Sequence, residues 1–282
     1  MHYMTDIPAL RALLKKWRDA QQTIALVPTM GNLHQGHLSL VEKAKAVADK
    51  AVVTIFVNPL QFGPNEDYAE YPRTLEADCA QLETLNVDLV FTPTAEQLYP
   101  RGLQQCTKVE VPELNKILCG VSRPQFFTGV TTVVNLLFNI IQPDKAIFGQ
   151  KDYQQLLIVK RMVKDLWMPI EILGMPTYRE TDGLAMSSRN GYLTPEQRAI
   201  APTLFHTLMS VKEKLVAGHR DFAVLEQQAI STLTTAGFTP DYIKICNTYD
   251  LHPATSTEKE FAVLAAAWLG KTRLIDNIEV IL

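Results

Sequence analysis

Two histidines three residues apart, His34 and His37, are the residues of this sequence whose types and spacing are best suited to chemistry on a phosphate. Imidazoles at the start of a helix can donate hydrogen bonds to phosphate oxygens, where the amino-terminal helix dipole also favours negative charge. The same spacing occurs on ordinary helix surfaces, and it could hold zinc, although no third ligand lies nearby in the sequence. If a helix has begun by His34, both imidazoles share one face, and Gly36 leaves room for a flat group.

The elements that must position these histidines are a strand before them and a helix after them. Residues 24–27 are an apolar run of strand type that ends at Pro28, and a turn follows through Gly31 and Asn32. The next segment has helical period, with Leu38, Val41, Ala44 and Ala48 on one side. A buried parallel strand that feeds a helix through a glycine-containing turn is where an open α/β sheet receives a nucleotide.

Strand-type and helix-type segments alternate five times in the first part of the chain. Strands are predicted at 24–27, 51–57, 87–91, 145–148 and 170–173, and helices at 6–22, 36–49, 74–85, 130–141 and 153–167. Residues 95–123 look less regular, with several Pro and Gly breakers. This alternation predicts an α/β fold with a Rossmann-like, doubly wound parallel sheet.

The pattern changes near Met175. Helices are predicted at 195–217 and 221–236, followed by strands at 241–246 and 261–268, and residues 273–278 stay unassigned. The sequence therefore predicts two domains, a larger one over 1–175 and a smaller α+β domain over 176–282.

Composition narrows the class of protein. The chain has 282 residues, 47% of them hydrophobic and 20% charged, and a formal net charge of −3. This balance shows no basic stripe, so we expect no nucleic-acid partner. Four cysteines without C-x-x-C spacing are typical of a reducing compartment. With no signal-type start and no membrane-spanning run, we expect a cytoplasmic protein with no membrane partner.

Four clusters carry the polar residues that chemistry would need: Met30–His37, Asn58–Gln61, Gly149–Gln155 and Met186–Arg189. The first three follow predicted strands, so parallel strands would bring them to one edge, although each alone is compatible with an ordinary loop. His34-Gln-Gly-His37 together with Met186-Ser-Ser-Arg189 resembles the HIGH and KMSKS signatures of the nucleotidyltransferase superfamily. Two hydroxyls and an arginine can hold a departing pyrophosphate, the arginine with two parallel bonds.

Within that superfamily, five segments in order resemble the pantothenate synthetase (pantoate–β-alanine ligase) family. They read VPTMGNLHQGHLSL at 27–40, FVNPLQF at 56–62, DYAEYPR at 67–73, FGQKDYQQ at 148–155 and DGLAMSSRN at 182–190. The resemblance implies that pantoate and ATP form pantoyl adenylate and pyrophosphate, and that β-alanine then displaces AMP. It also implies Mg²⁺ on the triphosphate, a homodimer, and a carboxy-terminal domain that acts as a lid carrying the Met-Ser-Ser-Arg motif.

The resemblance also implies roles for individual residues. His37 would be the proton donor, with His34 and Lys151 as further catalytic residues, and Asp152 would meet the ribose. Gln61 and Gln155 would hold pantoate, and Gln61 would also touch β-alanine, because a carboxamide can both donate and accept. The implied ATP-binding residues are Met30, Gly31, Asn32, Leu33, His34, Gln35, Gly36, His37, Gly149, Gln150, Lys151, Asp152, Tyr178, Met186, Ser187, Ser188 and Arg189.

Asn58 and Arg123 are further candidates for the site. The chain departs from the family pattern at two positions, with Cys119 in place of a glutamate and Phe126 in place of a histidine. Three alternatives stay open: another nucleotidyltransferase of the superfamily that acts on a phosphate ester, an aminoacyl-tRNA synthetase fragment, and an inactive nucleotide-binding module. The glutamine pair at 61 and 155 favours the ligase over the first, and the lack of basic surface disfavours the second.

Overall fold

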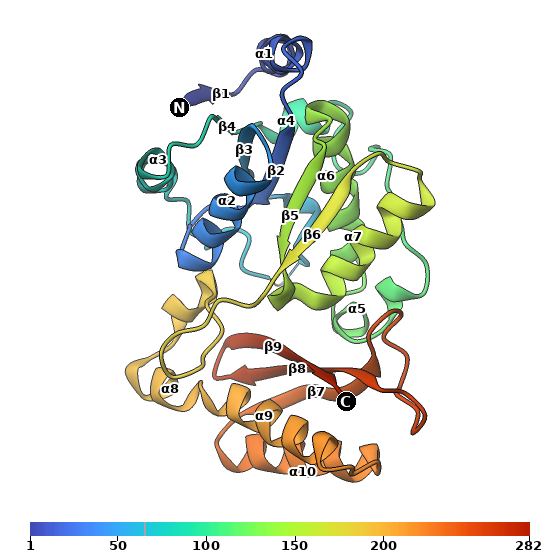
Figure 1. The fold of residues 1–282 in the computed structure, drawn as a ribbon. Coiled ribbons are helices and arrows are strands. Elements are labelled where there is room, and N and C mark those ends of the chain that lie inside the picture. The colour runs from blue at the N-terminus through green and yellow to red at the C-terminus, as the bar shows by residue number, and fades with distance from the viewer. Residues whose placement is uncertain (65) are drawn as a thin grey trace. The chain divides into compact units, whose positions relative to one another are not determined.

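A computed structural model of the chain describes residues 1–64 and 66–282, which form two compact units. Unit 1 comprises Met1–Gln150 and Gln155–Pro176, and unit 2 comprises Lys151–Gln154 and Thr177–Leu282. Each unit has its own sheet (Figure 1). None of the helices in these residues is long and apolar enough to cross a membrane.

The sheet of unit 1 has six strands in the order β1-β4-β3-β2-β5-β6, and every neighbouring pair is parallel. The prediction of an α/β fold with a parallel, doubly wound sheet is therefore confirmed. The strands are β1 (His2–Met4), β2 (Ile24–Thr29), β3 (Lys50–Ile55), β4 (Leu89–Phe91), β5 (Lys145–Gly149) and β6 (Glu171–Met175). The three-residue β1 was not expected, because a segment this short shows no periodicity and becomes a strand only by pairing with β4.

Helices cover both faces of this sheet (Figure 1). They are α1 (Ile7–Asp19), α2 (Gln35–Val47), α3 (Leu75–Thr84), α4 (Ala95–Leu98), α5 (Cys119–Ser122), α6 (Phe126–Ile141) and α7 (Tyr153–Asp165), with 3₁₀ turns η1 (Pro59–Gln61), η2 (Leu114–Lys116) and η3 (Gln150–Asp152). Leu38 and Val41 of α2 and Leu82 of α3 join one core with β2 and β3, and α6 contacts β2 from the other side. Because both faces are covered, the central strands read as continuous apolar runs instead of alternating ones.

The strand order reverses at β2, which lies between β3 and β5. The ladder between β2 and β5 pairs only Ala25 with Lys145 and Leu26 with Ala146, whereas β2 pairs with β3 along its whole length. Pro28, near the end of β2, has no N–H to donate to a ladder. The carboxyl ends of β2 and β5 therefore separate at the topological switch point, where open α/β sheets bind their ligands.

The sheet of unit 2 has three antiparallel strands in the order β7-β8-β9. The elements are α8 (Pro195–Ile200), α9 (Thr203–Val216), α10 (Phe222–Thr235), β7 (Thr239–Asn247), β8 (Glu260–Leu269), β9 (Thr272–Ile281) and the 3₁₀ turn η4 (Ser188–Tyr192). Apolar residues of α9 and α10 pack with alternate residues of the strands, for example Leu208 and Leu233 with Phe261 and Val263. The prediction of a smaller α+β fold in this part of the chain is confirmed.

One prediction for unit 2 was wrong in detail, and one segment had been left unassigned. The helix expected over 195–217 is two helices, because Pro202 lacks the N–H that a continuous helix would need at that position. Residues 273–278, which the sequence left unassigned, are part of β9, where Asp276 and Asn277 interrupt the apolar pattern. Both side chains are nevertheless buried, and each has hydrogen-bond partners in unit 2.

Candidate functional site

The paired histidines lie at the turn between β2 and α2, at the switch point of the parallel sheet. The helix begins at Gln35, one residue earlier than the predicted 36, and His34 is its extended N-cap residue, so the helix has not begun by His34. The two imidazoles nevertheless lie against each other, with ring centroids 4.1 Å apart and ring planes tilted by 37°. Residues Met30–His37, which we call the histidine turn, thus hold both rings together at the amino end of α2, where the helix dipole favours an anion.

Backbone hydrogen bonds fix the orientation of both rings. Nδ1 of His34 accepts from the N–H of Gly36 at 3.1 Å, and Nδ1 of His37 accepts from the N–H of His34 at 3.3 Å. A nitrogen that accepts carries no proton, so a neutral ring must carry its proton on Nε2. Nε2 of each histidine is therefore a hydrogen-bond donor, which is the role that a phosphate oxygen requires.

A buried carboxylate on α3 holds the turn in shape. Asp78 is 1% exposed, and its two oxygens accept from the N–H groups of Asn32 at 2.9 Å and Leu33 at 2.8 Å. Gly31 has a φ of +84°, and a Cβ there would lie 3.0 Å from Oδ2 of Asp78. A glycine is thus required for both its backbone conformation and the close approach of the carboxylate. Sequence reasoning missed Asp78, because it lies 45 residues or more from the backbone that it holds.

Gln61, at the end of η1, lies against the histidine turn. Its Nε2 donates to the sulfur of Met30 at 2.9 Å, which brings a residue predicted to bind pantoate beside one predicted to bind ATP. Gln61 is 8% exposed, and its Oε1 accepts from Nδ2 of Asn58 at 3.1 Å. Asn58 in turn accepts from the hydroxyl of Tyr99 at 2.7 Å. Burial raises the pKa of Tyr99, which keeps this hydroxyl protonated as a donor.

The backbone of η1 is supported from α6 and from Arg123. A Cβ at Gly129 of α6 would lie 2.3 Å from the carbonyl oxygen of Leu60, so only glycine allows this approach. Arg123 donates to the carbonyl of Gln61 at 3.2 Å and pairs with Glu66 through Nε at 2.6 Å. Its guanidinium carbon lies 3.6 Å from the ring centroid of Phe126. Arg123 is therefore held beside the backbone of Gln61.

The two departures from the family pattern, Phe126 and Cys119, lie next to Arg123. Phe126 provides the aromatic face on which the guanidinium of Arg123 stacks, a contact that favours the cation. Cys119 is buried at the start of α5, and its carbonyl accepts from the N–H of Arg123 at 3.0 Å. Both residues therefore contact Arg123 directly.

The segment after β5 is divided between the two units. Gly149 and Gln150 belong to unit 1, and a Cβ at Gly149 would meet nothing within 4 Å. Gln155 is half-buried on α7 in unit 1. Lys151 and Asp152 belong to unit 2, where the side chain of Asn277 donates to the carbonyl of Lys151 at 2.9 Å.

Unit 2 brings together the other residues that were predicted to bind ATP. The N–H of Met186 donates to the carbonyl of Tyr178 at 2.9 Å, and Ser187 caps the 3₁₀ turn η4 by accepting from the N–H of Arg189 at 3.3 Å. The side chain of Tyr178 is 45% exposed. Tyr178 and the Met-Ser-Ser-Arg motif are thus two sides of one hairpin-like loop.

Two consecutive residues of β9, Asp276 and Asn277, anchor this loop and the backbone at Lys151. Asp276 accepts from both terminal nitrogens of Arg179, at 2.7 and 2.9 Å, while Asn277 holds Lys151. Arg179 also donates to the carbonyl of Gly183, which closes the loop. A bidentate pair of this kind fixes orientation as well as position. Neither residue of β9 was predicted, since the partners of each lie about 100 residues or more away along the chain.

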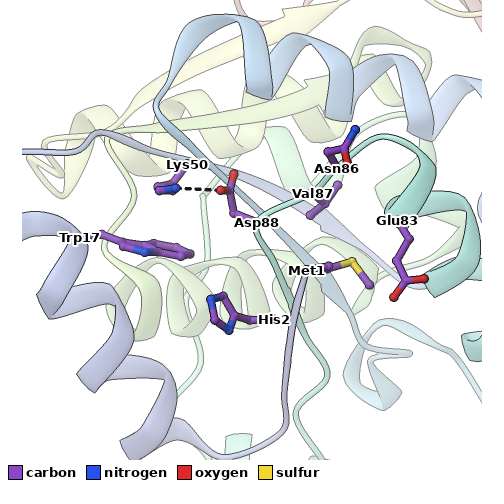
Figure 2. A pocket seen from close by; sticks show the side chains of 8 residues that line it. All are labelled: Met1, His2, Trp17, Lys50, Glu83, Asn86, Val87 and Asp88. Atoms are coloured by element: carbon purple, nitrogen blue, oxygen red, sulfur yellow. Dashed lines mark hydrogen bonds and ion pairs between the residues drawn. The ribbon is translucent and has the colours of Figure 1, made fainter.

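A cavity of about 370 Å³ lies elsewhere in unit 1 (Figure 2). Its lining includes Lys50, which forms an ion pair with Asp88 at 3.0 Å and lies 5.5 Å from the ring centroid of Trp17. Because Lys50 opens β3 and Asp88 precedes β4, this cavity lies at the amino-terminal edge of the sheet, opposite the histidine turn. It contains no residue that was predicted to bind substrate.

In the described residues, no three His, Cys, Asp or Glu side chains are grouped as a metal site.

The fold and the site together define a class of protein: an α/β protein with a Rossmann-like parallel sheet and a HIGH-like histidine turn at its switch point. The model of the Pantoate-beta-alanine ligase family matches residues 2–279. The chain belongs to the pantoate–β-alanine ligase family.

Named relatives are similar to this chain over almost its whole length. A pantothenate synthetase from Alkalilimnicola ehrlichii is 54% identical over 96% of this chain and 94% of its own length, and one from Idiomarina loihiensis is 56% identical over 95% of both. The crystal structure of pantothenate synthetase from Thermus thermophilus matches with a TM-score of 0.93 at 44% identity, covering both chains completely. The Francisella tularensis pantoate-beta-alanine ligase, complexed with beta-gamma ATP and beta-alanine, matches with a TM-score of 0.83 at 35% identity, over 99% of this chain and 97% of its own.

Proposed function

We propose that the chain is an ATP-dependent ligase that condenses (R)-pantoate with β-alanine to give pantothenate, with release of AMP and pyrophosphate. The observation that carries this proposal is the match to the pantoate–β-alanine ligase family from residue 2 to residue 279. The Francisella relative, whose complex contains an ATP compound and β-alanine, supports two of the three substrates. The donor geometry of the histidine turn supports the binding of a polyphosphate at the switch point.

In the first step, a carboxylate oxygen of pantoate attacks the α-phosphorus of ATP. The bond from that phosphorus to the oxygen bridging to the β-phosphate breaks, pyrophosphate leaves, and pantoyl adenylate remains. This chemistry depends on positioning and on neutralising charge more than on a covalent nucleophile. We assign donation to the phosphate oxygens to Nε2 of His34 and His37, with His37 as proton donor, and charge neutralisation to Lys151 and Arg189.

In the second step, the amine of β-alanine attacks the acyl carbon of the adenylate. The bond from the acyl carbon to the phosphate oxygen breaks, AMP leaves, and the nitrogen gives up its extra proton to solvent as the amide forms. We assign the holding of pantoate to Gln61 and Gln155, and contact with β-alanine to Gln61. The tight support of η1 would keep the carboxamide of Gln61 in place through both steps.

We also propose a division of labour between the two units. Unit 1 would bind the adenine nucleotide and pantoate, and the loop of Tyr178 and Met186–Arg189 in unit 2 would act as a lid over the triphosphate. Mg²⁺ would enter as part of the ATP substrate. Mg²⁺ usually keeps waters and phosphate oxygens as ligands, which suits a metal that arrives with the nucleotide.

A cytoplasmic location and a homodimeric state complete the proposal. All four cysteines are free thiols, as expected in a reducing compartment. Light scattering coupled to gel filtration measures the oligomeric state directly, and a mass of one chain instead of two would reject the homodimer.

The experiment that tests the proposed function is isotope exchange between labelled pyrophosphate and ATP. A ligase of this kind should catalyse exchange when pantoate is present and β-alanine is absent, since the first step is reversible by itself. An enzyme that transfers a nucleotide to a phosphate ester should show exchange only with that ester, and an inactive nucleotide-binding module should show none. Exchange that is independent of pantoate, or absent altogether, would reject the proposal.

A further inference from the structure

Asn58 uses all of its hydrogen-bonding capacity inside the protein. It is 1% exposed, and its two N–H groups donate to Oε1 of Gln61 and to the carbonyl of Gly129, both at 3.1 Å. Its Oδ1 accepts from the Tyr99 hydroxyl at 2.7 Å and from the N–H of Leu60 at 3.3 Å. A side chain so completely engaged positions its neighbours instead of contacting a substrate.

The orientation of this amide cannot be reversed. A flipped Asn58 would direct its oxygen at the carbonyl of Gly129 and its NH₂ group at the N–H of Leu60, which are acceptor–acceptor and donor–donor contacts. The backbone therefore fixes the direction of Asn58, and Asn58 fixes that of Gln61, whose oxygen must face Nδ2. Nε2 of Gln61 is left on the side of Met30 and the histidine turn.

We propose that Tyr99 is a positioning residue for pantoate binding, which acts through Asn58 to hold the carboxamide of Gln61 so that the N–H not bonded to Met30 can meet the substrate. This inference rests on the proposed function and adds a selectivity to it. Gln61 meets the substrate as a donor, so the group that it recognises is an acceptor oxygen of the small hydroxy acid. Tyr99 supplies the shortest hydrogen bond to Asn58, and it comes from a residue 41 positions away.

The variant Tyr99→Phe removes one hydroxyl and keeps the ring. Oδ1 of Asn58 then retains only the longer bond from Leu60, and the amide of Gln61 is less firmly held. Loss of one neutral hydrogen bond predicts a KM for pantoate raised about 3- to 10-fold, with the KM for ATP unchanged within about twofold. The matched control is Tyr3→Phe, which removes a hydroxyl that is bonded to Thr92 beside the edge strand β1.

A double-mutant cycle with Gln61→Ala separates positioning from a general structural effect. If Tyr99 acts through Gln61, adding Tyr99→Phe to Gln61→Ala should leave the KM for pantoate unchanged within about twofold. Additive effects on that KM would overturn the proposal. If Tyr99→Phe does not fold, Asn58→Ser enters the same cycle, because serine keeps a capping oxygen for Leu60 but loses the contact with Gln61.

The wild-type protein distinguishes a failure of the positioning role from a failure of the proposed function. Absence of pantoate-dependent exchange in the wild type would reject the proposed function, and this inference with it. An active wild type in which Tyr99→Phe raises the KM values of pantoate and ATP equally, or neither of them, would overturn the positioning role alone.

Discussion

Replacement of Asp78 by asparagine should disable the histidine turn without touching a histidine. The carboxylate accepts two backbone N–H groups of the turn, at 2.9 and 2.8 Å, and is almost fully buried. Asparagine keeps one acceptor oxygen, so one of these bonds is lost and an NH₂ group faces a backbone N–H. A hydrogen bond to a charged group contributes about 1.5–3 kcal/mol, so the equilibrium constant for ordering the turn should fall roughly 10- to 150-fold.

Pantoate-dependent pyrophosphate exchange measures this effect, and the rate for Asp78→Asn should fall by up to this factor of roughly 10 to 150, since the turn must be ordered to hold the phosphate. Asp88→Asn is the matched control, because Asp88 also accepts a backbone N–H, from Ala51 at 2.9 Å, but at the amino-terminal edge of the sheet. It should lower the melting temperature and leave exchange within about twofold of the wild type. A folded Asp78→Asn protein with normal exchange would refute the role given to this carboxylate.

Three further predictions follow from the proposed roles. His37→Ala should slow adenylate formation by about 10²-fold or more, as loss of a transition-state donor does, and near-normal exchange would show that the imidazole is not used. Gln155→Ala should raise the KM for pantoate much more than the KM for ATP in steady-state assays, and equal effects on the two would contradict its assignment. A hydrogen bond from Arg198 lowers the pKa of Asp182, so this pair stabilises the fold at neutral pH and its contribution is lost as the pH falls through the lowered pKa. The difference in melting temperature between wild type and Asp182→Asn should therefore be largest near about pH 6 and shrink towards about pH 2, and a difference independent of pH would contradict the pairing.

The arrangement of the parallel sheet could be predicted because its signals are local. Apolar runs such as Ile24–Val27 alternate with amphipathic helices, and this alternation by itself favours a doubly wound fold. The histidine turn was likewise visible, since strand, glycine turn and helix follow one another within about 20 residues. The start of α2 was predicted at residue 36, one residue late, because the N-cap role of His34 depends on backbone geometry that spacing does not reveal.

The residues that hold the site together could not be predicted from the sequence. Asp78, Tyr99 and Asp276 each have their decisive partners dozens of residues away, and no periodicity distinguishes them from ordinary polar positions. Asp276 also made β9 hard to recognise in the sequence, since a buried acid interrupts the apolar pattern by which strands are recognised. Such side chains become apparent only when the folded chain brings their partners together.

The most direct test of the account is the fate of oxygen-18 placed in the carboxylate of pantoate. If that carboxylate attacks the α-phosphorus of ATP, one labelled oxygen must leave with AMP when β-alanine displaces it, and the other must stay in the amide of pantothenate. Mass spectrometry of the products should therefore find one labelled oxygen in AMP and none in pyrophosphate. Unlabelled AMP beside fully formed pantothenate would contradict an adenylate intermediate, and with it the role proposed for the histidine turn.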